Sequence, residues 1–266
     1  MRITSWNILH GQPITPPEGQ NAGQLQGAIE GLGSDLIALQ EVDFGLDRSA
    51  GANQCAEVAT HMNTKWWGFA PTIVGTPGVQ WRKLAKSEKR IITTADGAIE
   101  SYGIGLVSKV EVVHWLRREL GRSLIGMPLA VGDEKGRMRP IYVKDEPRVA
   151  MAAVLVNGWT VINTHLSFVP LVNIYQLFKV VRWAGKIEKQ YSTKVIIVGD
   201  LNLPWGIPSR ITRWKRATKA LSYPSWKPAI SFDYILAKKR DIELMSEVLQ
   251  PQQAISDHKP ITVEVR

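Results

Sequence analysis

The chain has 266 residues, which is long enough to bury a large core, and no Ser- or Pro-rich linker divides it, so we expect one domain over residues 1–266. Lys and Arg number 33 against 24 Asp and Glu, and this net charge of +9 favours a polyanionic partner. The single cysteine, Cys55, excludes an internal disulfide and gives no sign of an oxidising compartment. It falls on an apolar helical stripe at 55–62, which predicts a packed thiol and not a nucleophile.

The chain carries no sign of export or of membrane insertion. The first predicted strand begins at Arg2 with no apolar stretch before it, so no signal peptide is visible. The longest apolar runs, such as 149–156, are far too short to span a bilayer. We therefore expect a soluble cytoplasmic protein, monomeric by default.

Strand and helix patterns alternate from the N-terminus, and polar side chains follow the strands. The strand-like segment 2–6 leads directly to Asn7. Apolar residues at helical spacing over 25–32 predict a helix, and the apolar strand 36–39 after it leads to Glu41.

Two basic segments in the middle of the chain, 75–98 and 116–146, follow neither pattern clearly. Loops this long in a compact domain are usually functional or mobile.

The second half repeats the arrangement. A strand at 160–162 leads to His165, and an amphipathic helix over 174–187, with Phe178 on its apolar stripe, connects it to the strand 195–198. The outward face of this helix carries cations, namely Lys179, Arg182, Lys186 and Lys189. The strand 195–198 reads Val-Ile-Ile-Val, which is typical of a strand covered on both faces, and it ends in Gly-Asp-Leu-Asn with Asp200 and Asn202.

The last two polar sites lie near the C-terminus. Asp233 lies inside the apolar strand 231–236, and the pair Asp257 and His258 comes just before an alternating strand at 261–265. Six strand edges along the chain thus carry an amide, a carboxylate or an imidazole. Side chains gathered at strand ends from distant parts of the sequence are how α/β enzymes build a site.

These motifs, in this order, resemble those of the endonuclease/exonuclease/phosphatase superfamily. They are Trp6-Asn7, Gln40-Glu41-Val42-Asp43, Thr164-His165-Leu166, Gly199-Asp200-Leu201-Asn202, Phe232-Asp233-Tyr234-Ile235 and Ser256-Asp257-His258. The resemblance covers residues 2–265. It implies an α/β fold, a four-layer sandwich of two mixed β-sheets flanked by helices, and divalent-metal-dependent hydrolysis of phosphoesters.

The candidate metal ligands are oxygen donors. Glu41 is the main one, with Asn7 and Asp257 close by, and neither cysteine nor clustered histidine ligands are available for zinc. Such a donor set suits Mg²⁺ or Mn²⁺. A solvated acid at a strand end is the alternative for Glu41 taken alone.

The remaining motif residues are candidates for catalysis. The resemblance implies that Asp200 and Asn202 orient or deprotonate the attacking water. His258 contacts the scissile phosphate or relays a proton, and Asp233 is its expected partner because a buried carboxylate without one is costly. His165 contacts phosphate or protonates the leaving group; a satisfied core histidine is the alternative.

Two residues are candidates for binding the substrate phosphate. Arg148 opens a strand and could bind a phosphate with both of its amino groups, and a surface salt bridge is an equal alternative. Tyr102 precedes a segment in which Ile104 and Lys109 stand where many relatives have Asn and Arg. This departure puts the local phosphate contacts in doubt and leaves the metal site as expected.

Three classes of function follow: a nuclease, a phosphatase or sphingomyelinase-like diesterase acting on a lipid or small molecule, and a non-catalytic phosphate-binding scaffold. The intact set of acids and imidazoles argues against the scaffold, and the net charge favours nucleic acid over phospholipid headgroups. The segment 205–227 interleaves tryptophans with cations. It fits a nucleic-acid surface, a membrane surface or an amphipathic helix with snorkelling cations.

Overall fold

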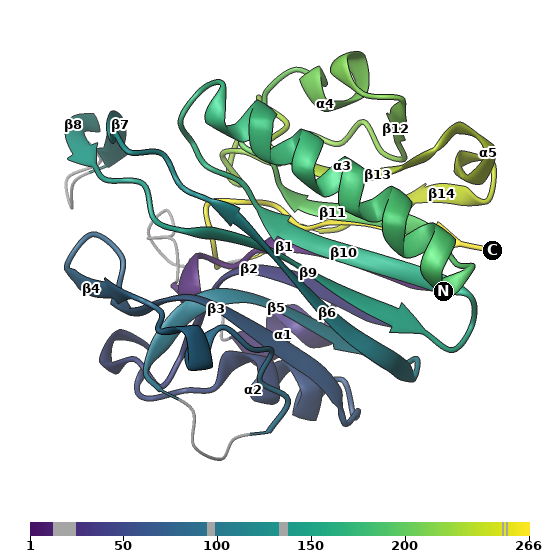
Figure 1. Ribbon diagram of the computed structural model, residues 1–266, viewed down its shortest axis with the longest axis horizontal. Coiled ribbons are helices and arrows are strands. Elements are labelled where there is room, and N and C mark those ends of the chain that lie inside the picture. The colour runs from purple at the N-terminus through teal and green to yellow at the C-terminus, as the bar shows by residue number, and fades with distance from the viewer. Residues whose placement is uncertain (13–24, 95–98, 133–137, 252, 254) are drawn as a thin grey trace.

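A computed structural model describes the chain except residues 13–24, 95–98, 133–137, 252 and 254 (Figure 1). Its centre is a pair of stacked mixed β-sheets. The first sheet has seven strands in the order β14-β15-β1-β2-β5-β3-β4. These are β1 (Arg2–Asn7), β2 (Leu36–Phe44), β3 (Trp66–Thr76), β4 (Gln80–Lys83), β5 (Ser101–Ser108), β14 (Met245–Val248) and β15 (Ile261–Val265).

The second sheet has six strands in the order β12-β13-β11-β10-β9-β6. These are β6 (Val112–Gly121), β9 (Arg148–Leu155), β10 (Trp159–His165), β11 (Lys194–Asp200), β12 (Trp214–Arg216) and β13 (Asp233–Lys238). A separate hairpin, β7 (Met127–Gly132) and β8 (Met138–Val143), projects from the body of the molecule at the left of Figure 1.

Helices cover the outer faces of both sheets. Helices α1 (Leu25–Glu30) and α2 (Gln54–His61) lie on the first sheet, and α3 (Val172–Tyr191) lies across the second. The shorter helices are α4 (Ile207–Ile211), α5 (Lys239–Ile242) and the 3₁₀ turns η1 (Leu9–Gly11), η2 (Asp47–Ser49) and η3 (Lys86–Glu88). The predicted four-layer sandwich is confirmed. Among the described helices, none is long and apolar enough to cross a membrane.

Alternation along the strands explains the layers. In β2, Leu36 joins the core between the two sheets, whereas Ile37 packs towards α1 and α2. In β11, Ile196 joins the same central core, whereas Ile197 packs under α3. Both strands are buried on two faces, which is why their sequences are continuous apolar runs. Cys55 is fully buried in the layer between α2 and the first sheet, as its stripe predicted.

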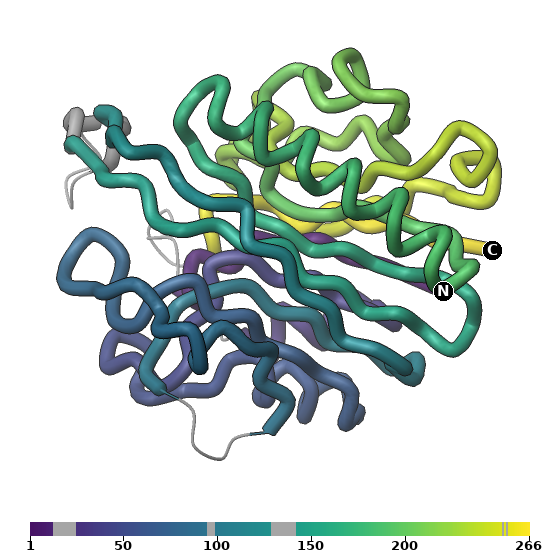
Figure 2. The backbone as a smooth tube through the Cα atoms, viewed as in Figure 1, coloured from purple at the N-terminus to yellow at the C-terminus, as the bar shows by residue number. Residues whose placement is uncertain are grey.

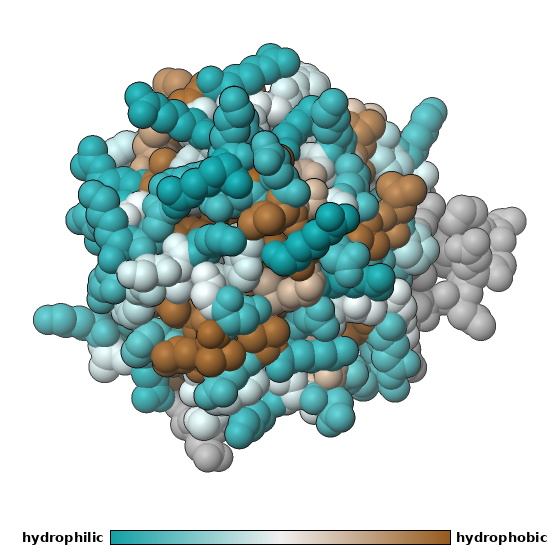
Figure 3. Space-filling model, turned by 90° about the vertical axis from the view of Figure 1, so that its right-hand side faces the viewer, coloured by the Kyte–Doolittle hydropathy of each residue, from teal (hydrophilic) through white to brown (hydrophobic). Residues whose placement is uncertain are grey.

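Parallel pairing brings the polar strand ends together. Strands β1 and β2 run parallel with Asn7 opposite Gln40, and β10 and β11 run parallel with His165 opposite Asp200. The carboxyl ends within each pair therefore lie at one edge. The two chain termini lie side by side away from this edge (Figure 2), where the amino group of Met1 donates to the carbonyl of Val265 over 2.7 Å. The face at the right-hand side of Figure 1 is mostly hydrophilic, with hydrophobic residues in separate patches (Figure 3).

Three local expectations were wrong. The segment 205–227 is not an amphipathic helix: it holds the five-residue α4, the short strand β12 and irregular backbone, and Trp214 is buried. The segments 75–98 and 116–146 contain strands, because their polar composition suits β4 and the edge strand β6, which need only one covered face. Residues 95–98 and 133–137 of these segments lie outside the described residues. Phe178, placed on the apolar stripe of α3, is 46% exposed.

Candidate active site

Asn7 joins the two sheets at the polar edge. It is the last residue of β1 and is buried. Its amide Nδ2 donates to Oε1 of Glu41 over 3.0 Å and to Oδ2 of Asp200 over 3.1 Å. Its Oδ1 accepts from the backbone N–H of Leu9 over 3.1 Å, so the nitrogen faces the acids. One side chain thus brings together carboxylates from β2 of the first sheet and β11 of the second.

Glu41 lies at a β-bulge. The pairing of β2 with β5 shifts register between Leu39 and Val42, and Glu41 has a left-handed φ of 55°. A bulge re-aims the side chain of its extra residue, and a non-glycine residue at positive φ is strained. Burial and the negative charge of Asp257 raise the pKa of Glu41 to about 7. The negative charge of Asp257 acts on Glu41 in the direction expected for two like charges.

Asp200 and Asn202 lie on a turn that the preceding glycine permits. Gly199 has a φ of 138°, and a Cβ there would lie 1.8 Å from the carbonyl oxygen of Thr164 on β10. After it, Oδ1 of Asp200 accepts from the backbone N–H of Asn202 over 3.0 Å. The amide of Asn202 donates to the carbonyl of Leu166 over 3.0 Å. Burial is the main cause that raises the pKa of Asp200 to about 6.

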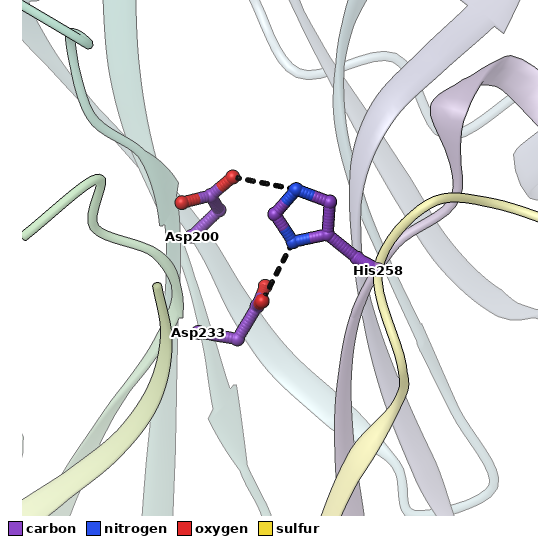
Figure 4. A group of neighbouring side chains, drawn as sticks. All are labelled: Asp200, Asp233 and His258. Atoms are coloured by element: carbon purple, nitrogen blue, oxygen red, sulfur yellow. Dashed lines mark hydrogen bonds and ion pairs between the residues drawn. The ribbon is translucent and has the colours of Figure 1, made fainter. Parts of the chain in front are cut away.

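Asp233, His258 and Asp200 form a buried chain of charges (Figure 4). Nδ1 of His258 lies 2.7 Å from Oδ2 of Asp233, and its Nε2 lies 3.8 Å from Oδ2 of Asp200. Burial alone would lower the pKa of His258, but the two carboxylates outweigh it and raise that pKa to about 10. The imidazole is therefore cationic at neutral pH. The expected pairing of Asp233 with His258 is present.

Three further residues hold His258, and of these only Tyr223 carries no signal in the sequence. The Trp6 indole donates to the carbonyl of His258 over 2.9 Å. The ring of Tyr223 lies 5.1 Å from the imidazole, centre to centre. Ser256 accepts from the backbone N–H of His258 over 3.0 Å and donates to the carbonyl of Asn7. Ser256 belongs to a recognised motif, but Tyr223 follows no strand-end pattern.

His165 approaches the same oxygen of Asp200 as His258 does. Its Nε2 is 3.6 Å from Oδ2 of Asp200, and the side chain is buried. Burial, followed by the positive charge of Arg148, holds the pKa of His165 well below its usual value. The two imidazoles therefore differ: His258 is charged and His165 is neutral.

Arg148 is buried, which excludes the surface salt bridge considered from the sequence. Its Nη2 lies 2.9 Å from Oε1 of Glu146 and 3.3 Å from Oδ1 of Asp145. Its Nε is buried and has no hydrogen-bond partner among the described residues. Tyr102 lies nearby and is also buried, and burial with the charges of Glu41 and Glu146 raises its pKa.

The donor set and its charge fit a divalent cation. Glu41, Asp257 and Asp200 are acids whose pKa values are raised, because loss of solvent and the negative charges of neighbouring acids, including Asp233, disfavour the charged forms. A hard cation would relieve this repulsion, and oxygen donors are what Mg²⁺ and Mn²⁺ prefer. Asp200, Asp233 and His258 also place one donor atom each within 4.8 Å of one another. His258 already uses Nδ1 on Asp233 and is protonated, which makes it a poor ligand.

Comparison with known proteins assigns the family. The family model described as the Endonuclease/Exonuclease/phosphatase family matches residues 4–258. The chain belongs to this family, whose members are divalent-metal-dependent phosphoesterases, so it is a hydrolase of phosphate esters. The comparison with curated proteins found no match.

Solved structures share the fold at low sequence identity. An endonuclease/exonuclease/phosphatase from Beutenbergia cavernae is 17% identical with a TM-score of 0.58, and the match covers 99% of this chain and 71% of that one. A mannosyl-6-phosphatase from Bacteroides thetaiotaomicron is 10% identical with a TM-score of 0.55, covering 100% and 99%. The human Nocturnin catalytic domain is 14% identical with a TM-score of 0.51, covering 99% and 92%.

Proposed function

We propose that the protein is a phosphodiesterase that cleaves nucleic acid by metal-assisted attack of water. The observation that carries the chemistry is the Asn7 amide, which gathers Glu41 and Asp200 next to the cationic His258. A phosphodiester placed there would meet acids that can hold a cation, a base for water and a positive imidazole. The net charge of +9 around an acidic site favours a polyanionic substrate.

Asp200 is the proposed general base. Its raised pKa of about 6 lets it accept a proton near neutral pH, and the bonds from Asn202 and Asn7 keep both of its oxygens in place. Asn202 is proposed to orient the water that Asp200 deprotonates.

The two imidazoles would act on the phosphoryl group in different ways. His258, kept cationic by Asp233, would place a charged N–H beside the phosphoryl oxygens and stabilise the charge that develops there. Burial keeps His165 neutral, which favours a hydrogen bond to phosphate over protonation of the leaving group. The buried Arg148 and Tyr102 are proposed to support the phosphate pocket, with Arg148 also keeping His165 neutral.

Mg²⁺ or Mn²⁺ is the proposed cofactor, held by Glu41 and Asp257. Asn7, expected from the sequence to be a ligand, would instead position Glu41, because its amide nitrogen faces the acids and its oxygen accepts from Leu9. When bound, such an ion would neutralise a phosphate oxygen and the departing oxyanion. What supports the assignment is that both acids are partly buried and that the charge of Asp257 raises the pKa of Glu41, a repulsion that a cation would relieve.

A substrate panel tests the proposal. Plasmid, single-stranded DNA, RNA, inositol phosphates, sphingomyelin and bis-p-nitrophenyl phosphate would each be assayed with Mg²⁺, Mn²⁺ or EDTA. We expect cleavage of nucleic acid and of bis-p-nitrophenyl phosphate with either metal, with a rate on nucleic acid that falls steeply as salt is added. Hydrolysis confined to phosphomonoesters or sphingomyelin, with little response to salt, would contradict it.

A further inference from the structure

A basic groove lies on the outer face of α3, away from the buried acids. Its volume is about 1000 Å³. Five of the residues that line it are cations: Arg118 on β6, Lys179, Arg182 and Lys186 on α3, and Arg213 just before β12. None of its lining residues is acidic, and none of the five cations forms an ion pair within the described part of the chain.

The alternation of side chains along β6 keeps Glu119 out of the groove. Successive residues of β6 point to opposite faces, so Arg118 faces α3 whereas Arg117 and Glu119 face the other sheet. Arg117 donates to the carbonyl of Pro71 on β3, and Glu119 pairs with Arg117 and with Lys89. Partial burial and the charge of Arg118 lower the pKa of Lys179, although Glu119 opposes this shift. The groove therefore carries uncompensated positive charge.

Aromatic rings lie among these cations. Tyr175, Phe178 and Trp183 line the groove, and Tyr175 and Phe178 are 63% and 46% exposed. Nζ of Lys179 lies 5.5 Å from the centre of the Tyr175 ring and donates to the carbonyl of Leu120 over 2.8 Å. Exposed rings alternating with unpaired cations suit a single strand of nucleic acid, in which bases stack on rings and phosphates meet cations. A membrane surface would instead favour a continuous apolar ridge with cations at its flanks.

The N-terminal end of α3, the helix that carries the groove, is attached to the catalytic turn. At the first turn of α3, the amide of Asn173 donates to the carbonyl of Asn202 over 2.9 Å. From Tyr175 to Lys186 the helix rises about 16 Å away from this contact, at about 1.5 Å per residue. A strand that leaves the catalytic centre past Asn202 would meet Tyr175 first and Lys186 last.

We infer that the α3 groove binds a single-stranded segment of nucleic acid several nucleotides away from the bond that is cleaved. This inference rests on the proposed function, because it names the polymer that the catalytic site would cut. It places two rings and five cations along one path, so affinity for a long strand would exceed affinity for a short one.

Equilibrium binding separates the groove from the chemistry. Anisotropy of labelled DNA and RNA strands of about 30 nucleotides, long enough to cover typical single-strand sites, would be measured in EDTA so that cleavage plays no part. We expect Arg182→Ala/Lys186→Ala to weaken binding about tenfold or more and to lower the slope of log K against log salt by about 1.4. Phe178→Ala should weaken binding about tenfold through lost stacking. Lys189→Ala/Lys239→Ala, which removes the same two charges outside the groove, should bind like the wild type.

Measurements of KM and of binding to lipid vesicles complete the test. In Arg182→Ala/Lys186→Ala the KM for the long strand should rise about tenfold, while bis-p-nitrophenyl phosphate is hydrolysed at the wild-type rate. Equal binding by the groove and control variants would overturn the inference. So would loss of binding to phosphatidylserine vesicles in the groove variant with unchanged binding to both strands. If the wild type binds strands through the groove but cleaves none of them, the proposed function fails and the groove assignment stands.

Discussion

Asp233 decides the charge of His258. Its carboxylate is buried and lies 2.7 Å from Nδ1 of the imidazole, and its charge is the largest cause that raises the pKa of His258 to about 10. Asp233→Asn keeps the shape but removes that charge, so we expect a fall in kcat of about 100-fold or more and a lower melting temperature, because a buried cation loses its partner. The check is kcat on bis-p-nitrophenyl phosphate together with the melting temperature. The exposed Asp47→Asn is the matched control, and a wild-type rate in Asp233→Asn would contradict the assigned role.

Direct loss of the base or the imidazole should be more severe. Oδ2 of Asp200 lies 3.1 Å from the Asn7 amide and within 3.8 Å of both His165 and His258, so its removal takes away the carboxylate that all three share. We expect Asp200→Ala and His258→Ala each to abolish turnover while circular dichroism shows an intact fold. Unchanged rates in both variants would end the mechanism proposed above.

The thiol of Cys55 should be inert in the folded protein. Burial raises its pKa, and Cys55 packs from α2 against the first sheet with no exposed surface. Only the thiolate reacts with alkylating agents, so we expect iodoacetamide to label Cys55 only when the chain unfolds. Labelling followed against denaturant concentration is the measurement, and fast labelling under native conditions would show that the thiol is accessible.

At the scale of elements, β10 and β11 approach each other more closely than any side chain permits at Gly199. A Cβ there would lie 1.8 Å from the carbonyl oxygen of Thr164, which is backbone and cannot turn aside. Gly199→Ala should therefore lower the free energy of unfolding by about 3 kcal/mol or more and displace Asp200.

Gly185 on α3 provides the matched control, since a Cβ there meets nothing within 4 Å. Gly185→Ala should raise stability by about 0.5–1 kcal/mol, because alanine loses less backbone entropy in a helix. Urea unfolding of both variants measures whether the free energy of unfolding falls in Gly199→Ala and rises in Gly185→Ala. A Gly199→Ala variant as stable as the wild type would show that the two strands can separate at no cost.

A polar contact also fixes how the two sheets stack. The amide of Asn163 on β10 donates to the carbonyls of Leu39 and Gly105 on the other sheet, and its oxygen accepts from Gln40 over 2.7 Å. These groups would otherwise be buried without partners, at about 1–3 kcal/mol each. The contact fixes the position of the carboxyl ends of β1 and β2 relative to those of β10 and β11, where the acids lie.

At the scale of the whole molecule, the surface is basic and the centre of the site is acidic. Asp200 is buried and Glu41 and Asp257 are partly buried, and the charges of Asp257 and Asp200 both disfavour the charged form of Glu41. A ligand that binds only the folded state stabilises it, so Mg²⁺ or Mn²⁺ should raise the melting temperature of EDTA-treated protein and restore its activity. Glu41→Gln should abolish that rise. An equal rise in the variant would place the metal elsewhere, for example at the group formed by Asp200, Asp233 and His258.

Local patterns in the sequence determined much of the fold. The apolar runs that end in Asn7, Glu41, His165 and Asp200 predicted the strands, because side-chain period and strand-end polarity are local properties. The four layers and the family followed from the resemblance of the ordered motifs. The same local patterns failed at Phe178 and at 205–227, where packing against neighbouring elements, and not helical spacing, decides what is exposed.

Only the tertiary structure decided which of these groups touch. Asn7 and Asp200 are 193 positions apart and meet at 3.1 Å, and the bulge that aims Glu41 inward depends on the register of β2 against β5. It also decided that Arg148 is buried against two acids and that the cations of α3 line one groove with Arg118 and Arg213. The periodicity of the sequence does not contain these distances, because they follow from the stacking of the two sheets and from the packing of α3 on the second sheet.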